Sequence, residues 1–145
     1  MNIVFVLGTE EVMAAVKFSR QREAIKEFLY SRKDHPTAEV VYNNVVKEYP
    51  KISLGTVYRN LSFLVDKGEA ITVPCSDGSV HFDCNLKPHY HFQCNEFGKI
   101  ADIEMDDADY EKKILDGARK HTDCGEITGH VTFFYGICDE CKKKK

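Results

Sequence analysis

Two histidines and one aspartate in the second half of the chain have the residue types and the spacing of metal ligands. His89 and His91 are two residues apart in a predicted strand, so both side chains point to the same face of it. Asp102 lies on the next predicted strand, where its carboxylate could stand beside the two imidazoles. Mixed nitrogen and oxygen donors suit Fe²⁺ or Mn²⁺ with an open coordination position better than a closed tetrahedral zinc site.

Two residues of the first half could add to this set. His35 follows the first predicted helix, and Asp83 ends a predicted strand. Spacing alone leaves open whether they join His89, His91 and Asp102 in one site.

Three of the six cysteines could bind a metal or carry out redox chemistry. Cys138 and Cys141 have C-x-x-C spacing, which indicates a metal site or a thiol redox pair in a chain without secretory features, and Cys94 could join them. An active redox pair usually lies at the N-terminus of a helix, whereas this pair follows a predicted strand. The other cysteines are interpreted as small apolar side chains that pack in the interior; they are Cys75, Cys84 and Cys124.

The first half has the pattern of three helices. Ser19, Thr37 and Ser53 have the residue type of helix N-caps, and apolar side chains recur at helical spacing after each of them. The Asp34-His35-Pro36 sequence is expected to end the first helix, and Pro50 the second.

A β-hairpin is predicted after the third helix. Segments 70–73 and 80–83 flank the polar turn residues 76–79. Three helices followed by a hairpin form the layout of a winged helix-turn-helix domain. We expect this domain over residues 13–84, preceded by an N-terminal extension of residues 1–12.

The second half predicts a small α/β domain. A hinge is expected at residues 85–88, and the domain itself, over residues 89–145, is expected to contain strands at 89–94 and 99–103, a helix at 109–120 and a strand at 127–137. A unit of this size buries too little apolar surface alone, so pairing with a second copy is expected. The fold class is therefore α+β, a homodimer with an N-terminal winged helix-turn-helix domain and a small C-terminal α/β dimerisation domain.

The third predicted helix has the features of a DNA-recognition helix. Nine Lys/Arg stand against five Asp/Glu between residues 14 and 64, although the whole chain has a net charge of −3. A locally basic half permits a nucleic-acid-binding face. The buried stripe leaves polar side chains for contact with double-stranded DNA, and the candidates are Lys51, Ser53, Thr56, Tyr58 and Arg59.

The sequence argues against a membrane or exported protein. No apolar run approaches the roughly 20 residues that a membrane span needs. The short apolar segment 3–7 lacks a basic flank, so we expect no signal peptide and a cytoplasmic location.

Six runs, in order and spacing, resemble the ferric uptake regulator superfamily, over about residues 17 to 141. They are His35-Pro-Thr-Ala-Glu39, Ser53-Leu-Gly-Thr-Val-Tyr-Arg-Asn-Leu61, His81-Phe-Asp83, His89-Tyr-His91-Phe-Gln-Cys94, Gly98-Lys-Ile-Ala-Asp102 and Tyr135-Gly-Ile-Cys138-Asp-Glu-Cys141. The resemblance implies a metal-dependent transcriptional repressor, not an enzyme.

The resemblance also implies one regulatory site for Fe²⁺ or Mn²⁺. Its ligands, carried over by position, would be His35, Asp83, His89, His91 and Asp102. Iron-sensing members usually carry Glu at the position of Asp102, whereas peroxide-sensing members carry Asp. In the peroxide-sensing branch, bound iron reacts with hydrogen peroxide and a ligand histidine is oxidised; His35 and His89 hold the matching positions.

The sequence leaves three alternative functions open. The first is an iron- or zinc-uptake repressor of the same family with the same ligands, since metal choice is tuned by groups that the sequence does not reveal. The second is a thiol redox protein that uses Cys138 and Cys141. The third is a metal hydrolase, for which the sequence shows no spare general base.

The chain departs from the family at its structural zinc site. The family normally uses two C-x-x-C pairs, and here the position three after Cys94 is Phe97. A structural zinc ion takes four ligands. Zn²⁺ bound by Cys94, Cys138 and Cys141 would therefore need a water molecule, Glu96 or Asp139 as its fourth ligand, or Cys94 could form a disulfide instead.

Overall fold

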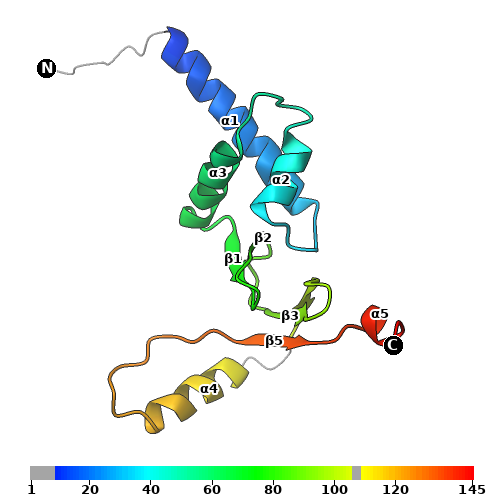
Figure 1. Cartoon of the computed structure of the whole chain (residues 1–145). Helices are drawn as coiled ribbons and strands as arrows, with labels where there is room; N and C mark the ends of the chain where they lie inside the picture. Colours follow the sequence, from blue (N-terminus) through cyan, green and yellow to red (C-terminus); the bar gives the residue numbers. More distant parts are fainter. Residues whose placement is uncertain (1–8, 106–108) are drawn as a thin grey trace, which may run out of the picture. The chain divides into compact units, whose positions relative to one another are not determined.

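The computed structural model describes residues 9–105 and 109–145 of the chain. It divides into two compact units, one ending at Leu86 and the other beginning at Lys87 (Figure 1). The two units are described separately.

The first unit consists of three helices and a two-stranded hairpin, as expected. The helices are α1 (Thr9–Tyr30), α2 (Ala38–Val45) and α3 (Leu54–Asp66) (Figure 1). Strands β1 (Ile71–Pro74) and β2 (Val80–Asp83) pair antiparallel. This order is that of a winged helix-turn-helix domain, and it confirms the predicted fold class for this half.

Local capping explains where α2 and α3 begin. The hydroxyl of Thr37 accepts a hydrogen bond from the backbone N–H of Val40, and that of Ser53 accepts one from Thr56. Each cap satisfies an N–H group that the first helical turn leaves without a partner. Both predicted N-caps are confirmed.

One core holds the helices and the hairpin together. It contains Ile25 and Leu29 of α1, both at most 2% exposed, with the buried faces of α2 and α3 packed against them. The other buried members of this core are Ala38, Val41, Val45, Ile52, Val57, Leu61, Leu64, Ala70 and Phe82. Helix α3 is therefore fixed by its apolar stripe, and its opposite face is exposed.

Two helix boundaries differ from the sequence expectations. Helix α1 begins at Thr9, so Ser19 lies inside it instead of capping it, and residues 9–12 of the expected extension are helical. Residues 10–18 contain no helix breaker, and Glu10 and Glu11 lie in the first turn, where carboxylates favour a helix. Residues 1–8 lie outside the described residues.

Helix α2 ends earlier than expected, because the sequence predicted that Pro50 would end it. It ends at Val45, and the backbone then turns, with the N–H of Tyr49 donating to the carbonyl of Val45. Val40, expected in the core, is 40% exposed. The core contacts of α2 are therefore confined to one narrow stripe.

The second unit is a three-stranded sheet with two helices. Its elements are β3 (Tyr90–Cys94), β4 (Ile100–Ile103), α4 (Asp109–Lys120), β5 (Phe133–Gly136) and α5 (Asp139–Lys142). The strand order is β4-β3-β5, with β4 antiparallel and β5 parallel to β3. Parallel strands need a long connection, and α4 lies within it.

The last strand is shorter than expected. The sequence predicts residues 127–137, whereas β5 covers only four of them and pairs with β3 from His91↔Phe133 to Cys94↔Gly136. Strand β3 is itself only five residues long, so the residues before Phe133 have no partner strand within the described residues. His130 is thus not on a strand.

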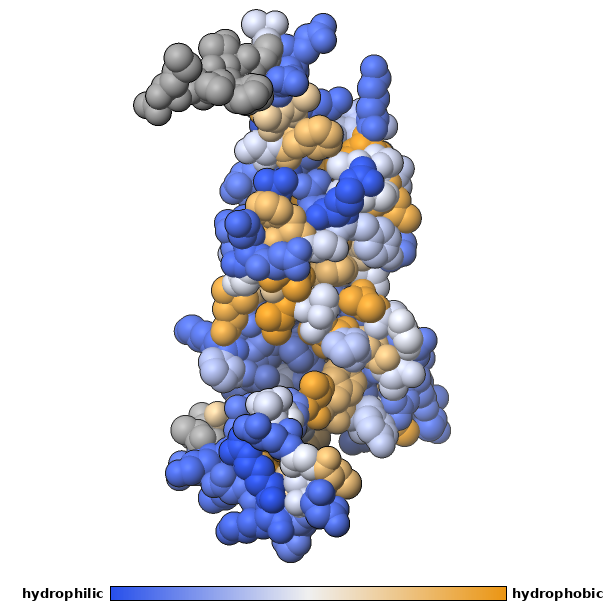
Figure 2. All heavy atoms as spheres, turned by 90° about the vertical axis from the view of Figure 1, so that its left-hand side faces the viewer, coloured by the Kyte–Doolittle hydropathy of each residue, from blue (hydrophilic) through white to orange (hydrophobic). Residues whose placement is uncertain are grey.

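The second unit leaves apolar side chains uncovered. No residue of α4 is buried, and Val131 and Tyr135 are 84% and 70% exposed. Apolar side chains reach the surface among charged ones on the face shown in Figure 2. Such exposure is typical of a surface that another chain covers. Among the described residues, no helix is both long and apolar enough to span a lipid bilayer.

Candidate metal centres and nucleic-acid interface

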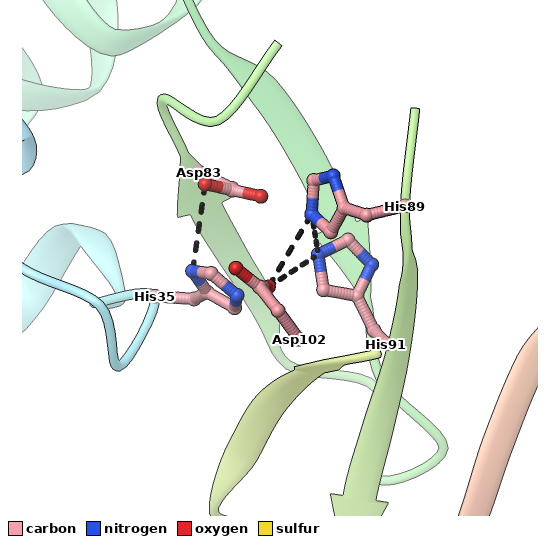
Figure 3. Close-up of side chains that lie close together, drawn as sticks. All are labelled: His35, Asp83, His89, His91 and Asp102. Atoms are coloured by element: carbon pink, nitrogen blue, oxygen red, sulfur yellow. Dashed lines mark hydrogen bonds and ion pairs between the residues drawn. The ribbon is translucent and has the colours of Figure 1, made fainter. Parts of the chain in front are cut away.

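Three candidate ligands of the second unit lie together at one end of its sheet. His91 and Asp102 are directly opposite each other in the β3–β4 pair, and His89 lies two residues before His91. The Nε2 atoms of the two histidines are 3.0 Å apart. Asp102 Oδ1 is 3.3 Å from His89 Nε2 and 3.6 Å from His91 Nε2 (Figure 3). Three donor atoms thus converge, as a cation requires.

The backbone fixes the orientation of His89. Its Nδ1 is 2.6 Å from the carbonyl oxygen of Lys87 and can donate a hydrogen bond to it. Its other ring nitrogen, Nε2, is directed toward His91 and Asp102. Metal-binding histidines are commonly held by such a bond from the other ring nitrogen.

The first unit holds the other two candidate ligands as a pair. His35 Nδ1 and Asp83 Oδ1 are 3.6 Å apart, and their side chains are only 2% and 5% exposed (Figure 3). Burial of a charged carboxylate is costly unless it is paired or binds a cation. His35 and Asp83 are thus far apart in sequence but adjacent at the end of the hairpin.

A strained backbone positions His35. Its φ angle is +50°, the left-handed region that a non-glycine residue adopts at a cost of about 1–3 kcal/mol. Two contacts with β2 hold this segment: the N–H of Phe82 donates to the carbonyl of Pro36, and His81 Nδ1 lies 2.5 Å from the carbonyl of His35. His81 thus braces the loop of His35.

The donor chemistry of both groups fits a divalent transition metal. The pair in the first unit offers one imidazole and one carboxylate, and the group in the second unit offers two imidazoles and one carboxylate; such nitrogen and oxygen donors suit Fe²⁺ or Mn²⁺. The structure brings His35 to Asp83 in the first unit and gathers His89, His91 and Asp102 in the second. Metal binding itself stays a prediction.

Three cysteines of the second unit form a separate cluster. Cys94 Sγ is 3.5 Å from Cys141 Sγ, and Cys138 Sγ is also 3.5 Å from Cys141 Sγ. Cys94 and Cys141 are at most 2% exposed. None of the six cysteines is in a disulfide, so the disulfide alternative for Cys94 does not occur here.

Backbone N–H groups directed at its sulfur favour the thiolate form of Cys94. The N–H of Cys138 points to its sulfur, with N and Sγ 3.4 Å apart, and this bond together with the N–H groups of Phe97 and Glu96 lowers the pKa of Cys94. Burial raises the pKa of Cys141. Thiolate is the form that binds zinc.

Two statements about cysteines need correction. Cys138 is the N-cap of α5, so the pair does stand at the start of a helix, although one of only four residues. Cys124 is exposed and not packed in the interior, whereas Cys75 is buried and Cys84 packs against the core.

The exposed face of α3 carries the candidate DNA contacts. Tyr58 and Arg59 are exposed, and Arg59 donates a hydrogen bond to Thr56 Oγ1 at 2.9 Å. Ser53 and Thr56 are joined through their hydroxyl oxygens at 2.9 Å, and Lys51 is exposed just before the helix. Polar donors thus cluster over the first two turns, where helix N–H groups also favour phosphate.

Comparisons with known proteins agree with these features. The ferric uptake regulator family model matches residues 13–128. The chain is 34% identical over 131 residues to a peroxide-responsive repressor, PerR, of Staphylococcus epidermidis, which covers 90% of this chain and 85% of that relative. The chain belongs to the ferric uptake regulator family.

Solved structures support the same fold. The Campylobacter jejuni peroxide stress regulator has a TM-score of 0.69 and 25% identity, covering 93% of this chain and 100% of that chain. The Helicobacter pylori ferric uptake regulator has a TM-score of 0.71 and 21% identity, covering 97% of each chain. As a member of this family, the protein is a metal-responsive regulator; family members act as DNA-binding dimers.

Sequence reasoning missed residues that hold α3 in place. Asn60 is 4% exposed; its Oδ1 accepts from Arg22 Nε at 3.1 Å and its Nδ2 donates to the carbonyl of Thr56 at 2.9 Å. Tyr58 donates to Glu39 of α2 at 2.9 Å. A polar residue inside the apolar stripe of α3 is the one signal that could have revealed Asn60.

Proposed function

We propose that this member of the ferric uptake regulator family is a dimeric repressor that senses hydrogen peroxide through iron-dependent oxidation of a ligand histidine. The observation that carries the proposal is the contact of Asp102 with both His89 and His91. The resemblance of the sequence to the family implies an aspartate in this position for the peroxide-sensing branch, and PerR repressors are among the similar curated proteins.

The regulatory ion would bind both groups of ligands at once. Its ligands are His35 and Asp83 from the first unit and His89, His91 and Asp102 from the second. An ion that binds both units in one relative orientation better than in others raises the population of that orientation. In a dimer, that orientation sets the distance between the two α3 helices.

The protein side chains determine the response to peroxide. Bound Fe²⁺ would supply the redox chemistry that cleaves hydrogen peroxide next to the ligands. In the net reaction, one peroxide oxygen atom would be inserted into the imidazole of His35 or His89, the other would leave as water, and the oxidised ring would be a poorer donor. Loss of one donor weakens the link between the units, so the DNA-binding orientation loses its stabilisation.

DNA binding would use the exposed face of α3. The hydroxyls of Ser53 and Thr56 and the N–H groups of the first turn suit a phosphate, whereas Arg59 can reach a guanine edge. Tyr58 is exposed, and its hydroxyl donates a hydrogen bond to Glu39. Because phosphate contacts supply most of the affinity, binding should weaken as the salt concentration rises.

The dimer would be formed by the second unit. Val131 and Tyr135 are the most exposed large apolar residues of this unit, and α4 buries none of its side chains. If a partner copy covers this surface, its burial stabilises the dimer by about 25 cal/mol for each Å² of apolar area.

A structural Zn²⁺ would bind the cluster of Cys94, Cys138 and Cys141. Thiolate sulfur is the ligand type that selects zinc over Fe²⁺ or Mn²⁺. The cysteine cluster would therefore bind zinc, whereas the histidine and aspartate ligands would bind Fe²⁺ or Mn²⁺.

The function is tested by loading the protein with Fe²⁺ or with Mn²⁺ and exposing both forms briefly to peroxide. The iron form should lose operator binding, and a peptide containing His35 or His89 should gain the mass of one oxygen atom. The manganese form should keep binding. Equal sensitivity of both forms would rule out peroxide sensing and favour an iron- or zinc-uptake repressor.

A further inference from the structure

The cysteine cluster lacks a fourth protein donor at the position where the chain should provide one. Three residues after Cys94 stands Phe97, whose side chain is 55% exposed and carries no donor atom. The ammonium of Lys144 lies over the Phe97 ring, 4.5 Å from its centroid. Phe97 therefore packs on the outside of this segment and leaves the fourth ligand position unfilled.

The carboxylates near the cluster are engaged elsewhere. Glu96 pairs with Lys145 at 2.6 Å, and Glu140 pairs with Lys99 at 3.1 Å. Asp139 is 90% exposed and has Lys142 3.8 Å away. The two carboxylates considered as a fourth ligand, Glu96 and Asp139, therefore point to lysines or to solvent. Exposed ion pairs of this kind are weak. They show where the two carboxylates point, but they would not by themselves prevent a carboxylate from binding a metal ion.

The three sulfurs are already arranged for a metal. The Cys94 turn is closed by the Gly98 N–H, which donates to the Cys94 carbonyl at 2.8 Å, and Gly98 has a φ of +64°. Bonds of about 2.3 Å to a tetrahedral zinc place sulfurs roughly 3.8 Å apart. The 3.5 Å separations of the cluster need only a small adjustment to reach this value.

Solvent reaches the cluster on the side of Cys138. This residue is partly exposed and lines a cleft of about 230 Å³, whose other lining residues are Phe92, Lys99, Ala101, Asp139 and Glu140. At about 30 Å³ for each water molecule, the cleft is large enough for a small organic molecule. The ammonium of Lys99 also interacts electrostatically with the sulfurs of Cys94 and Cys138.

We propose that Cys94, Cys138 and Cys141 form an open zinc site whose fourth ligand is a small thiol from solution, bound through the cleft beside Cys138. This inference rests on the proposed Zn²⁺ at the cluster and adds that the site exchanges its fourth ligand. The thiol releases its proton to solvent, and its sulfur displaces the water that would otherwise complete the coordination shell.

Donor type favours a thiol, because soft sulfur donors match a zinc ion that already has three of them better than a carboxylate does. Charge opposes it: Zn²⁺ with three thiolates has a net charge of −1, and a fourth thiolate makes it −2. Lys99 offsets part of this charge, although it also pairs with Glu140.

Cobalt provides a direct count of the thiolates. Co²⁺ replaces Zn²⁺, and its sulfur-to-metal charge-transfer absorption grows with the number of bound thiolates. The protein would carry His89→Ala, His91→Ala and Cys124→Ser, so that neither the histidine group nor the exposed thiol contributes. In this background, the Phe97→Cys variant gives the reference absorption for four bound thiolates. The Cys138→Ser variant gives the reference absorption for two.

The titration uses 3-mercaptopropionate as the thiol and 3-hydroxypropionate as its matched control. The background protein should start with three thiolates and gain about one third in absorption, saturably, with the thiol only. The Phe97→Cys variant should start at the higher value and not respond.

Two results would overturn the open site. A four-thiolate spectrum before any thiol is added would mean that another cysteine completes the site. A three-thiolate spectrum that thiol leaves unchanged would mean that the fourth position is closed to it. Absence of thiolate bands, with no zinc retained in native mass spectrometry, would instead overturn the proposed zinc site itself, and with it this inference.

Discussion

His91 and Asp102 face each other directly across the β3–β4 pair, with Nε2 of one 3.6 Å from Oδ1 of the other. The register of two short antiparallel strands therefore decides which carboxylate meets the histidines. A one-residue slip would turn Asp102 to the other face of the sheet. The length of the side chain at this position then determines how near its oxygen comes to both imidazoles.

Replacement of Asp102 by Glu tests that relationship. In Asp102→Glu the register stays fixed, so the longer side chain carries its carboxylate past the point where it contacts both His89 and His91. We expect metal-dependent DNA binding to persist, while oxidation of His35 and His89 falls by about tenfold or more at equal peroxide. Peptide mass spectrometry measures the oxidation. Glu104→Asp, which changes an exposed neighbour by the same methylene, serves as the control; unchanged oxidation in Asp102→Glu would contradict the prediction.

Arg59 should contribute to sequence recognition and Lys51 only to affinity. Arg59→Ala removes the forked donor that can pair with guanine, so operator affinity should fall by about 10–100-fold, with a smaller loss on unrelated DNA. Lys51→Ala should weaken binding to both DNAs alike and reduce the salt dependence by about one phosphate contact. Fluorescence anisotropy at several salt concentrations measures both effects. Lys112→Ala, on α4 of the second unit, makes the same charge change as a control. It should change neither the DNA affinity nor its salt dependence.

Asn60 should stabilise the first unit. Its side chain is 4% exposed and bonds both Arg22 of α1 and the carbonyl of Thr56. Asn60→Ala leaves the Arg22 guanidinium without this acceptor, and the free energy of unfolding should fall by about 1–3 kcal/mol. Urea denaturation measures the change. Asn43→Ala, at an exposed position of α2, should alter the free energy by less than about 0.5 kcal/mol; similar losses in both variants would speak against the role of Asn60.

Cysteine alkylation should distinguish Cys84 from Cys124. Burial raises the pKa of the Cys84 thiol to about 11, whereas Cys124 is exposed. At pH 8 the thiolate population of Cys84 is then roughly a hundredfold below its ordinary value, and iodoacetamide should modify Cys124 first. The folded state holds the protonated thiol, so the stability linked to Cys84 is present below its ordinary pKa of 9 and is lost as the pH rises through about 11. Equal rates in a peptide-resolved time course would show that the region around Cys84 opens readily.

Several features of this protein could be predicted from the sequence because they depend on neighbouring residues. The hydroxyls of Thr37 and Ser53 cap helices a few residues away, and both N-caps were predicted correctly. The two-residue spacing of His89 and His91 brings their side chains together as predicted, although β3 begins at Tyr90, so that His89 lies just before the strand instead of on it. The absence of a cysteine at Phe97 is likewise visible in the sequence and is the origin of the open cluster.

Other features depended on contacts between distant segments. Ser19 has the residue type of an N-cap, but no breaker precedes it, and the helix continues back to Thr9. The last strand is limited by the length of β3, and the role of His81 depends on the carbonyl of His35, 46 residues away. The sequence by itself determined the residue types, the local caps and the alternation of the ligands. The tertiary structure decided which of these side chains meet, because strand register and loop packing are set by non-local contacts whose energies no single segment contains.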